Sequence, residues 1–300
     1  VGSWTNVAPC PPRVTPTLAG VRPAEPALAA AAAVWHIACP SRPLRLPGVS
    51  MAGFRARADA PVDLQVVPYP AVTVVLDVGE GLLVVDDATG RQHRGAVVTG
   101  LAPRGLRGVG RDIECLQVRL SPLAAHAVLG DSAQLSGAVV ALDDLWGCDG
   151  ARVQERLAAT PSWDDRFAIA EAALARRHEA GPAADAEVAR AWSQMAAGRG
   201  QVRVDGLATE VGWSRKRLWS RFRSQVGLTP KRAAQLVRFD HAAHRLAAGD
   251  NVAQVAAESG YADQSHLHRD VVAFAGTTPG ALATAPWLAV DDVAWADPPA

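Results

Sequence analysis

Lysine is nearly absent from this sequence of 300 residues, in which Lys216 and Lys231 are the only two. Arginine therefore supplies almost all of the positive charge, a bias that we attribute to genomic base composition more than to function. The 30 Lys and Arg residues balance the 30 Asp and Glu residues. A net charge of zero argues against a protein that coats nucleic acid with its whole surface.

The sequence also lacks an apolar run of about 18 residues, so it predicts no transmembrane helix. The alanine-rich run at 27–33 is too short, too weakly hydrophobic and too far from a basic start to be a secretory signal. We therefore expect a cytoplasmic protein that does not contact a membrane. Free thiols are consistent with that reducing compartment.

Metal-binding patterns are missing as well. The four cysteines are widely spaced without a C-x2-C pair, which favours free thiols over a zinc site and leaves redox sensing as a minor alternative. These cysteines are Cys10, Cys39, Cys115 and Cys148. His36, His93 and His126 come from separate segments without H-x-H pairing, so ordinary, partly exposed histidines are the better interpretation. We predict no metal and no cofactor.

Signatures of common enzymes are absent too. The sequence has no Gly-x-Ser-x-Gly elbow, no P-loop, no dinucleotide-binding fingerprint and no paired-histidine metal motif. It therefore predicts no catalytic residue, and we expect a protein that is not an enzyme.

What the sequence does contain is a repeat near its C-terminus. Residues 207–230 (LATEVGWSRKRLWSRFRSQVGLTP) are echoed by residues 255–279 (VAAESGYADQSHLHRDVVAFAGTTP). Each copy has an alanine-containing apolar run, a glycine, an amphipathic segment and a Gly-x-Thr-Pro end. This order predicts two helix-turn-helix units in tandem.

Each predicted turn has residues suited to its geometry. Gly212 and Gly260 stand where the first helix of a unit must end with positive φ. Ser214 and Asp263 follow, and each has a side-chain oxygen that can accept hydrogen bonds from the free amides of the next helix. We predict these second helices over 214–226 and 263–275 and interpret them as DNA-reading helices.

The first of these helices has two distinct faces. Leu218, Phe222 and Val226 recur every four residues and are expected to face inward. The opposite face is a basic stripe with one aromatic residue. It comprises Lys216, Trp219, Ser220 and Arg223, with Arg215 near the helix start.

The second helix repeats this arrangement with a more polar outer face. Leu267, Val271 and Phe274 form the predicted inward row. The residues expected to face outward are Gln264, Ser265, His268 and Arg269.

Between the copies, residues 230–246 predict one connecting helix, which begins at the helix-compatible Pro230 and ends before Gly249. Such a helix spans roughly 25 Å. This is the right scale to hold two recognition helices in successive major-groove turns, about 34 Å apart. A monomer would then contact two segments on one face of DNA.

The pair GWSRKRLWSRF-x4-GLTP and GYADQSHLHRD-x5-GTTP resembles the DNA-binding domain of the AraC/XylS family of bacterial transcription regulators, over roughly residues 200–285. The second copy is nearest to the family pattern of a Gly-aromatic pair, a cap, Gln-Ser-His, an apolar residue and an arginine. Its matching residues are Gly260, Tyr261, Asp263, Gln264, Ser265, His266, Leu267 and Arg269. Two residues depart from the pattern: Val271 replaces the usual Phe, and Arg221 directly precedes Phe222, where many members keep a basic residue two positions before it.

Some of these residues have competing interpretations. Trp213 is better explained as a core wedge than as a DNA contact, whereas Trp219 suits a thymine-methyl contact and packing on a neighbouring domain about equally. His241 and His244 are expected on a solvated face of the connecting helix. The five basic residues between Ser214 and Arg223, without an acid among them, favour phosphate or base contact over a solvated surface.

Charge is distributed in agreement with this interpretation. Residues 199–285 hold twelve Lys and Arg against seven Asp and Glu, whereas residues 1–198 hold eighteen against twenty. The basic excess lies where the helix-turn-helix units are predicted.

The front of the chain predicts a small antiparallel β barrel or sandwich. Short β-like runs separated by Gly, Pro and Asp clusters occur at 33–38, 53–58, 72–78, 81–86, 96–99 and 113–120. Short helices or turns are predicted at 122–129 and 140–146, and longer helical stretches at 151–159, 164–178 and 183–197. The AraC/XylS resemblance implies a cupin-like barrel that binds a small effector, and CLQVRL, SPLAAHAVLG and LDDLWG look like the end of such a domain. The expected fold class is α+β, with an all-α C-terminal domain.

An effector pocket in this barrel is predicted from aromatic and arginine side chains, which suit a small anionic ligand. The candidates are Trp35, Arg55, Arg57, Tyr69 and Arg119. Surface or structural roles are the competing interpretation, because the sequence does not establish which face of a strand each residue occupies.

Together these features predict a loosely ordered lead-in at 1–32, an effector-sensing or dimerisation domain at 33–180, a linker helix at 181–200, a DNA-binding domain at 201–286 and a tail at 287–300. The predicted function is a sequence-specific, effector-responsive transcription regulator located on the nucleoid. The alternative is a small-molecule-binding or catalytic barrel with an accessory DNA-binding domain. Alkylation-repair proteins that share this module look like four-cysteine zinc methyl acceptors, and that cysteine cluster is missing here.

The expected partners follow from this function. They are double-stranded DNA, a small-molecule effector and, for an activator, RNA polymerase. We also expect a homodimer formed through residues 33–198, although no heptad pattern supports it.

Overall fold

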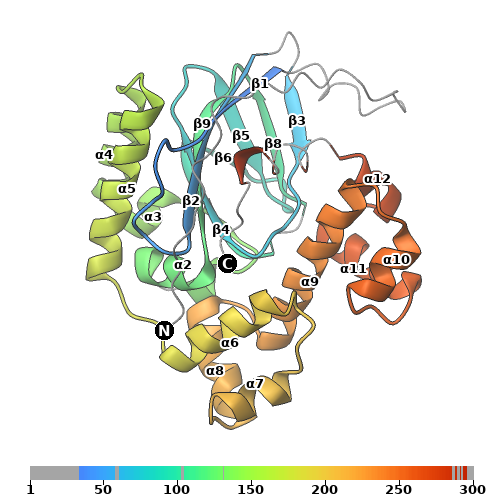
Figure 1. Cartoon of the computed structure of the whole chain (residues 1–300). Helices are drawn as coiled ribbons and strands as arrows, with labels where there is room; N and C mark the ends of the chain where they lie inside the picture. Colours follow the sequence, from blue (N-terminus) through green and yellow to red (C-terminus); the bar gives the residue numbers. More distant parts are fainter. Residues whose placement is uncertain are drawn as a thin grey trace.

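The computed structural model describes residues 34–57, 61–102, 105–130 and 132–285, together with 288, 291 and 293–295. The predicted lead-in, Cys10 and most of the predicted tail lie outside the described residues. Antiparallel strands and their flanking helices come first, and the chain from residue 186 to 283 is helical (Figure 1). This order confirms the predicted α+β class.

Two antiparallel sheets make up the N-terminal part. The larger has the order β1 (Val34–Ala38), β2 (Val49–Arg57), β9 (Glu114–Leu120), β4 (Val72–Asp77), β7 (Ala96–Thr99) and β10 (Val139–Ala141). The smaller has the order β3 (Val62–Gln65), β8 (Arg107–Arg111), β5 (Leu82–Asp86) and β6 (Gln92–Arg94). A buried apolar cluster that includes Phe54 of the larger sheet and Leu83 and Val85 of the smaller one joins the two into a sandwich.

The six predicted strands all exist, but β3, β6, β8 and β10 were not predicted. They are short, polar or rich in glycine, as in RGVGR of β8, and they owe their extended shape to pairing with neighbours. The helix predicted over 140–146 is wrong at its start. Val139–Ala141 pairs with β7, and only α3 (Leu142–Trp146) is helical.

Strand β9 separates two packing environments, because successive side chains of a strand point to opposite faces. Leu116, Val118 and Leu120 belong to the core shared with the helices. Cys115 faces the second cluster, between the sheets. Arg119 has the same parity as Cys115, so it also points away from the helices.

Four helices flank the larger sheet, as Figure 1 shows at its lower and left edges. They are α2 (Pro122–Leu129), α3, α4 (Cys148–Ala158) and α5 (Trp163–Ala180). A 3-10 turn, η1 (Ser132–Leu135), follows α2. The core between these helices and the sheet includes Phe167 and Leu174 of α5.

The C-terminal part contains seven helices among the residues described. They are α6 (Ala186–Ala197), α7 (Val204–Glu210), α8 (Arg215–Val226), α9 (Pro230–Ala247), α10 (Val252–Glu258), α11 (Gln264–Ala275) and α12 (Pro279–Ala283). Helix α9 packs against α8 on one side and against α10 and α11 on the other. It corresponds to the predicted connecting helix.

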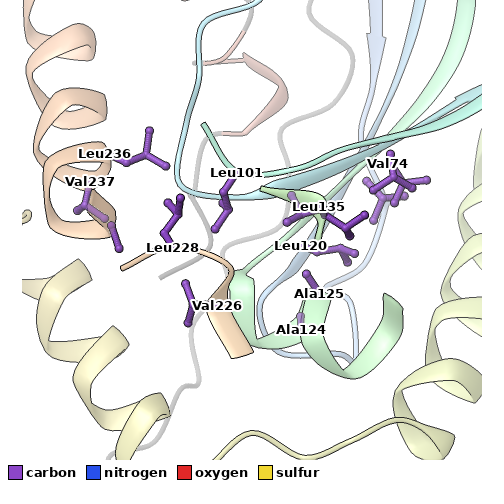
Figure 2. Close-up of a cluster of buried hydrophobic side chains, with 14 of the residues drawn as sticks. Val74, Leu101, Leu120, Ala124, Ala125, Leu135, Val226, Leu228, Leu236 and Val237 are labelled. Atoms are coloured by element: carbon purple, nitrogen blue, oxygen red, sulfur yellow. The ribbon is translucent and has the colours of Figure 1, made fainter. Parts of the chain in front are cut away.

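An apolar seam joins the sandwich to these helices (Figure 2). From the N-terminal part it includes Leu101, Leu120 and Leu135, and from the C-terminal part Val226, Leu228, Leu236 and Val237. All seven side chains are buried. The end of α8 and the start of α9 are therefore packed directly on the sandwich.

Within the described residues, no helix combines the length and the apolarity that crossing a membrane requires.

Candidate nucleic-acid interface

The first helix-turn-helix unit consists of α7, a turn and α8. Gly212 has φ of 69°, and the Ser214 hydroxyl caps α8 by accepting a hydrogen bond from the Arg217 amide at 3.2 Å. Leu218, Phe222 and Val226 are completely buried. Gly227 ends the helix in the left-handed conformation. The predicted turn, cap and inward row of this unit are confirmed.

The second unit repeats this geometry with α10, a turn and α11. Gly260 has φ of 74°, and the Asp263 carboxylate accepts a hydrogen bond from the His266 amide at 2.7 Å. Leu267, Val271 and Phe274 are buried as predicted. Tyr261 is buried too, and its ring meets that of His266 edge-on at 5.1 Å, so these two family-pattern residues support the turn and do not face solvent freely.

Each recognition helix leaves its predicted outer stripe exposed. On α8 the exposed residues include Arg215, Lys216, Trp219, Ser220 and Arg223. On α11 they include Gln264, Ser265, His268 and Arg269. The structure thus places all nine predicted DNA-contact residues on accessible faces of two capped helices.

Helix α11 has one further outward residue that sequence reasoning missed. Of the described residues, Trp219 and Val272 are the large hydrophobic side chains that are most exposed, at 45% and 44%. Counted from the helix caps Ser214 and Asp263, Val272 occupies the position that Arg223 has in α8. The repeat in the sequence could have revealed Val272, because aligning the two copies places this apolar residue on the outer stripe of α11.

Ion pairs divide the basic residues of α8 into two groups. Arg215 Nε lies 2.8 Å from Asp205 Oδ1 of α7. Arg221 makes a two-pronged contact with Asp185, at 2.6 and 2.8 Å, and holds the pKa of that carboxyl below its usual value. Lys216 and Arg223 have no such carboxylate partner among the described residues, and Arg223 lies over the Trp219 ring at 5.3 Å. Among the predicted contact residues of α8, these two cations are the ones most available to a phosphate or a base.

Comparison with known proteins agrees with this geometry. Residues 207–285 match a protein family described as a helix-turn-helix domain. The match begins in α7 and extends beyond α12, so it spans both units and the connecting helix. Residues 207–285 form an AraC-type helix-turn-helix domain.

Solved structures with similar folds include ToxT from Vibrio cholerae O395, at 10% identity and a TM-score of 0.45, covering 79% of this chain and 98% of that one. An AraC-type DNA-binding-domain regulator from Chromobacterium violaceum has 23% identity and a TM-score of 0.31, covering 33% and 94%. The C-terminal domain of AraT from Geobacillus stearothermophilus has 17% identity and a TM-score of 0.32, covering 33% and 84%. No curated protein matches the chain in sequence.

In the AraC-type domain, α9 positions α11 through charged and aromatic contacts. Arg238 Nη2 lies 3.0 Å from Asp270 Oδ2, and both side chains are largely buried. The rings of Phe239 and Phe274 stack at 4.9 Å. These contacts fix which face of α11 points outward.

Trp213 supports the first unit of the same domain. Its side chain is partly buried against the core, and the Arg217 guanidinium lies over its ring at 4.3 Å. The predicted role as a wedge agrees with this position. Trp219, in contrast, is exposed on α8.

The predicted effector residues do not form one group. Tyr69 and Arg119 are adjacent, with the guanidinium 3.7 Å from the ring centroid. Trp35 is buried between the sheets, where it meets Phe54 edge-on at 6.3 Å. Arg55 is separated from them, because it pairs with Glu114 at 2.7 Å, and Glu114 also binds Arg166 of α5.

The solvated face expected for His241 and His244 is only partly correct, because both residues are intermediate in burial. The His244 side chain is 38% exposed, and its Nε2 lies 3.9 Å from Asp291 Oδ2 near the end of the chain. Asp240, one turn earlier on α9, is 3.7 Å from His244 Nδ1. Burial raises the pKa of Asp240 to about 6, opposed by His244 and reinforced by Asp291. This part of α9 therefore lies against Asp291.

The described cysteines Cys39, Cys115 and Cys148 form no disulfide. Burial raises the pKa of the Cys115 thiol to about 12, which makes it a poor thiolate and removes the basis for redox sensing there. Among the residues placed by the structure, no cluster of three or more His, Cys, Asp or Glu side chains is arranged to hold a metal ion.

Proposed function

We propose that this protein is a sequence-specific transcription regulator that inserts α8 and α11 into successive major-groove turns of double-stranded DNA. The observation that carries the proposal is the pair of capped helices on either side of α9, each with a buried apolar row and an exposed polar stripe. With 18 residues, α9 is about 27 Å long, which suits adjacent groove turns.

The two stripes differ in what they offer to DNA. Arg223 and Lys216 on α8 would bind guanine edges or phosphates. The main-chain amides at the starts of both helices would bind phosphates of the DNA backbone. Arg215 exchanges Asp205 for a phosphate at little cost, because exposed ion pairs are worth about 0–1 kcal/mol. Gln264 and Arg269 on α11 would contact base edges, with Ser265 and His268 beside them. Trp219 and Val272 would meet thymine methyl groups.

The N-terminal sandwich is the proposed sensing and dimerisation part, within the division 33–180, 181–200 and 201–286. We expect a small-molecule effector there, a second copy bound through residues 33–198 and, if the protein activates, RNA polymerase as a partner on the nucleoid. No catalytic role is proposed for either part.

The test is fluorescence anisotropy with DNA fragments from the gene's own upstream region, in the presence of random competitor and across a salt series. The wild type is compared with an Arg223→Ala, Arg269→Ala double variant. Arg176→Ala is the matched control, because Arg176 is an exposed arginine on α5, away from both stripes. Binding that survives competitor, is lost in the double variant and is retained in the control supports the proposal.

Weak, steeply salt-dependent binding that is blind to sequence would count against it. That outcome would favour the second function, a ligand-binding barrel whose DNA-binding domain is an accessory.

A further inference from the structure

The last described residues of the chain pack on the sandwich. Asp291 Oδ1 accepts a hydrogen bond from Arg119 Nη2 at 2.7 Å, and the Trp295 ring lies 4.2 Å from the Arg119 guanidinium carbon and 6.2 Å from the Phe54 ring. Trp295 and Ala294 are buried in the cluster between the sheets. In Figure 1 this segment is the dark red turn seen against the strands. A carboxylate and an indole from the chain's own end thus meet one buried arginine.

Arg119 requires an anion in this position. The residue is only 8% exposed, and a buried guanidinium without a carboxylate is strongly destabilising. Asp291 is the carboxylate that pairs with it among the described residues. The centroid of the Tyr69 ring lies 3.7 Å from the guanidinium carbon. The Arg119 guanidinium therefore contacts one carboxylate, from Asp291, and two aromatic rings, of which Tyr69 belongs to the sandwich and Trp295 to the C-terminal segment.

The site retains hydrogen-bonding capacity that Asp291 does not use. The buried Arg119 Nε has no hydrogen-bond partner within the described part of the chain, and neither has the Oγ of Ser50, its cross-strand neighbour on β2. Polar atoms buried without partners are costly. A ligand with a carboxylate of two free oxygens can satisfy Nε as well as Nη2, which the single contact from Asp291 Oδ1 does not.

The same carboxylate reaches the DNA-binding domain. While Oδ1 of Asp291 binds Arg119, Oδ2 lies 3.9 Å from His244 Nε2 on α9. Helix α9 connects the two helix-turn-helix units. An anion that replaces Asp291 at Arg119 would keep the arginine neutralised but would end the contact with the connecting helix.

We propose that Asp291 and Trp295 act as an internal ligand of the sandwich, and that a small aromatic carboxylate binds at Arg119 by displacing them. The inference rests on the proposed function, because it names the ligand class to which the sensing part responds. The ligand class follows from what the chain itself supplies, namely one carboxylate for the guanidinium and one flat ring to stack beside it. Displacement releases α9 from the C-terminal segment and so changes how the recognition helices are held.

The test is calorimetric titration of full-length protein with indole-3-acetate, which has both groups, and with the neutral indole-3-acetamide. We compare wild type with an Asp291→Asn, Trp295→Leu double variant, in which leucine keeps the segment apolar. A single Trp295→Leu variant is the second comparison in case the double variant does not fold, as judged by circular dichroism. Asp149→Asn is the control, since Asp149 pairs with Arg152 and Arg177 on the far helices.

We call the double variant and the single Trp295→Leu variant the opened variants. We expect indole-3-acetate to bind them at least tenfold more tightly than it binds wild type or the control. Indole-3-acetamide should bind none of these proteins. Adding Arg119→Met to the opened variant should abolish binding. Equal affinity in wild type and folded opened variants, or no binding to any of them, would overturn the inference.

Operator binding by the wild type is measured separately. If operator binding is specific while the opened variants gain no affinity for indole-3-acetate, the proposal of an internal ligand is wrong and the proposed function is supported. If the opened variants gain affinity for indole-3-acetate while DNA binding does not depend on sequence, the ligand site at Arg119 is supported and the proposed function is wrong.

Discussion

Arg119 and Asp291 are 172 residues apart in the sequence, yet their Nη2 and Oδ1 atoms are 2.7 Å apart. Arg119 lies on the central strand β9, and Asp291 also approaches His244 of α9. The pair therefore connects the sandwich, the C-terminal segment and the helix that separates the two DNA-reading units. A structural change in any one of these three parts would therefore affect contacts made by the other two.

Two arginines of α8, Arg223 on the outer stripe and Arg221 in an ion pair with Asp185, should differ in their importance for DNA binding. Arg223→Ala should weaken operator binding by about 1–3 kcal/mol, because Arg223 has no carboxylate partner among the described residues. Arg221→Ala should leave affinity almost unchanged, since Arg221 is not part of the outer stripe and Asp185 accepts two hydrogen bonds from its guanidinium. Anisotropy titrations at physiological salt compare the two. Unchanged affinity in Arg223→Ala would remove that residue from the interface.

The two recognition helices should contribute in different ways. Replacing Gln264 and Arg269 by alanine should reduce discrimination between operator and random DNA more than it reduces affinity for random DNA, because the α11 stripe is more polar than basic. Competition titrations give both quantities. A uniform loss on all sequences would contradict this and assign α11 to phosphate contact.

The ion pair that holds α11 should be important for stability. Asp270→Ala should lower the free energy of unfolding by about 3 kcal/mol, because it leaves Arg238 largely buried without its carboxylate. Asp250→Ala is the matched control. Its pair with Arg245 is more exposed and should be worth no more than about 1 kcal/mol. Urea denaturation measures both, and similar losses for the two variants would show that burial of the Asp270 pair is unimportant.

Stability should depend on pH through Asp240. Its folded-state pKa is raised from 3.8 to about 6, so between about pH 4 and 6 the folded protein retains a proton that the unfolded chain has released. Stability from this group is therefore present at low pH and is lost as pH rises through that window, by an amount on the order of 3 kcal/mol. The groups around it are His244, Asp291 and Arg119.

Asp240→Asn should accordingly raise the melting temperature at pH 7 and flatten its decline between pH 4 and 6. Thermal melts of both proteins at several pH values test this. Asp77, whose pKa burial also raises to about 6, is present in both proteins, so its contribution cancels in the difference. If the difference in melting temperature does not change with pH, Asp240 does not titrate as described.

The sequence by itself determined the double helix-turn-helix almost to the residue. Helices predicted at 214–226 and 263–275 are observed at Arg215–Val226 and Gln264–Ala275, with Ser214 and Asp263 as their caps. The reason is that positive φ at glycine, capping by a neighbouring side chain and an apolar row every four residues are all local interactions. The nine outward residues follow from the same periodicity.

Only the tertiary structure decided the rest. Strands such as β6 and β8 exist because their neighbours pair with them, and the face on which Arg55 lies depends on register. The apolar seam at Leu228, the position of His244 against Asp291 and the burial of Trp295 beside Arg119 all join segments remote in sequence. Contacts of this kind leave no periodic signal in either segment, because each depends on where the other one folds.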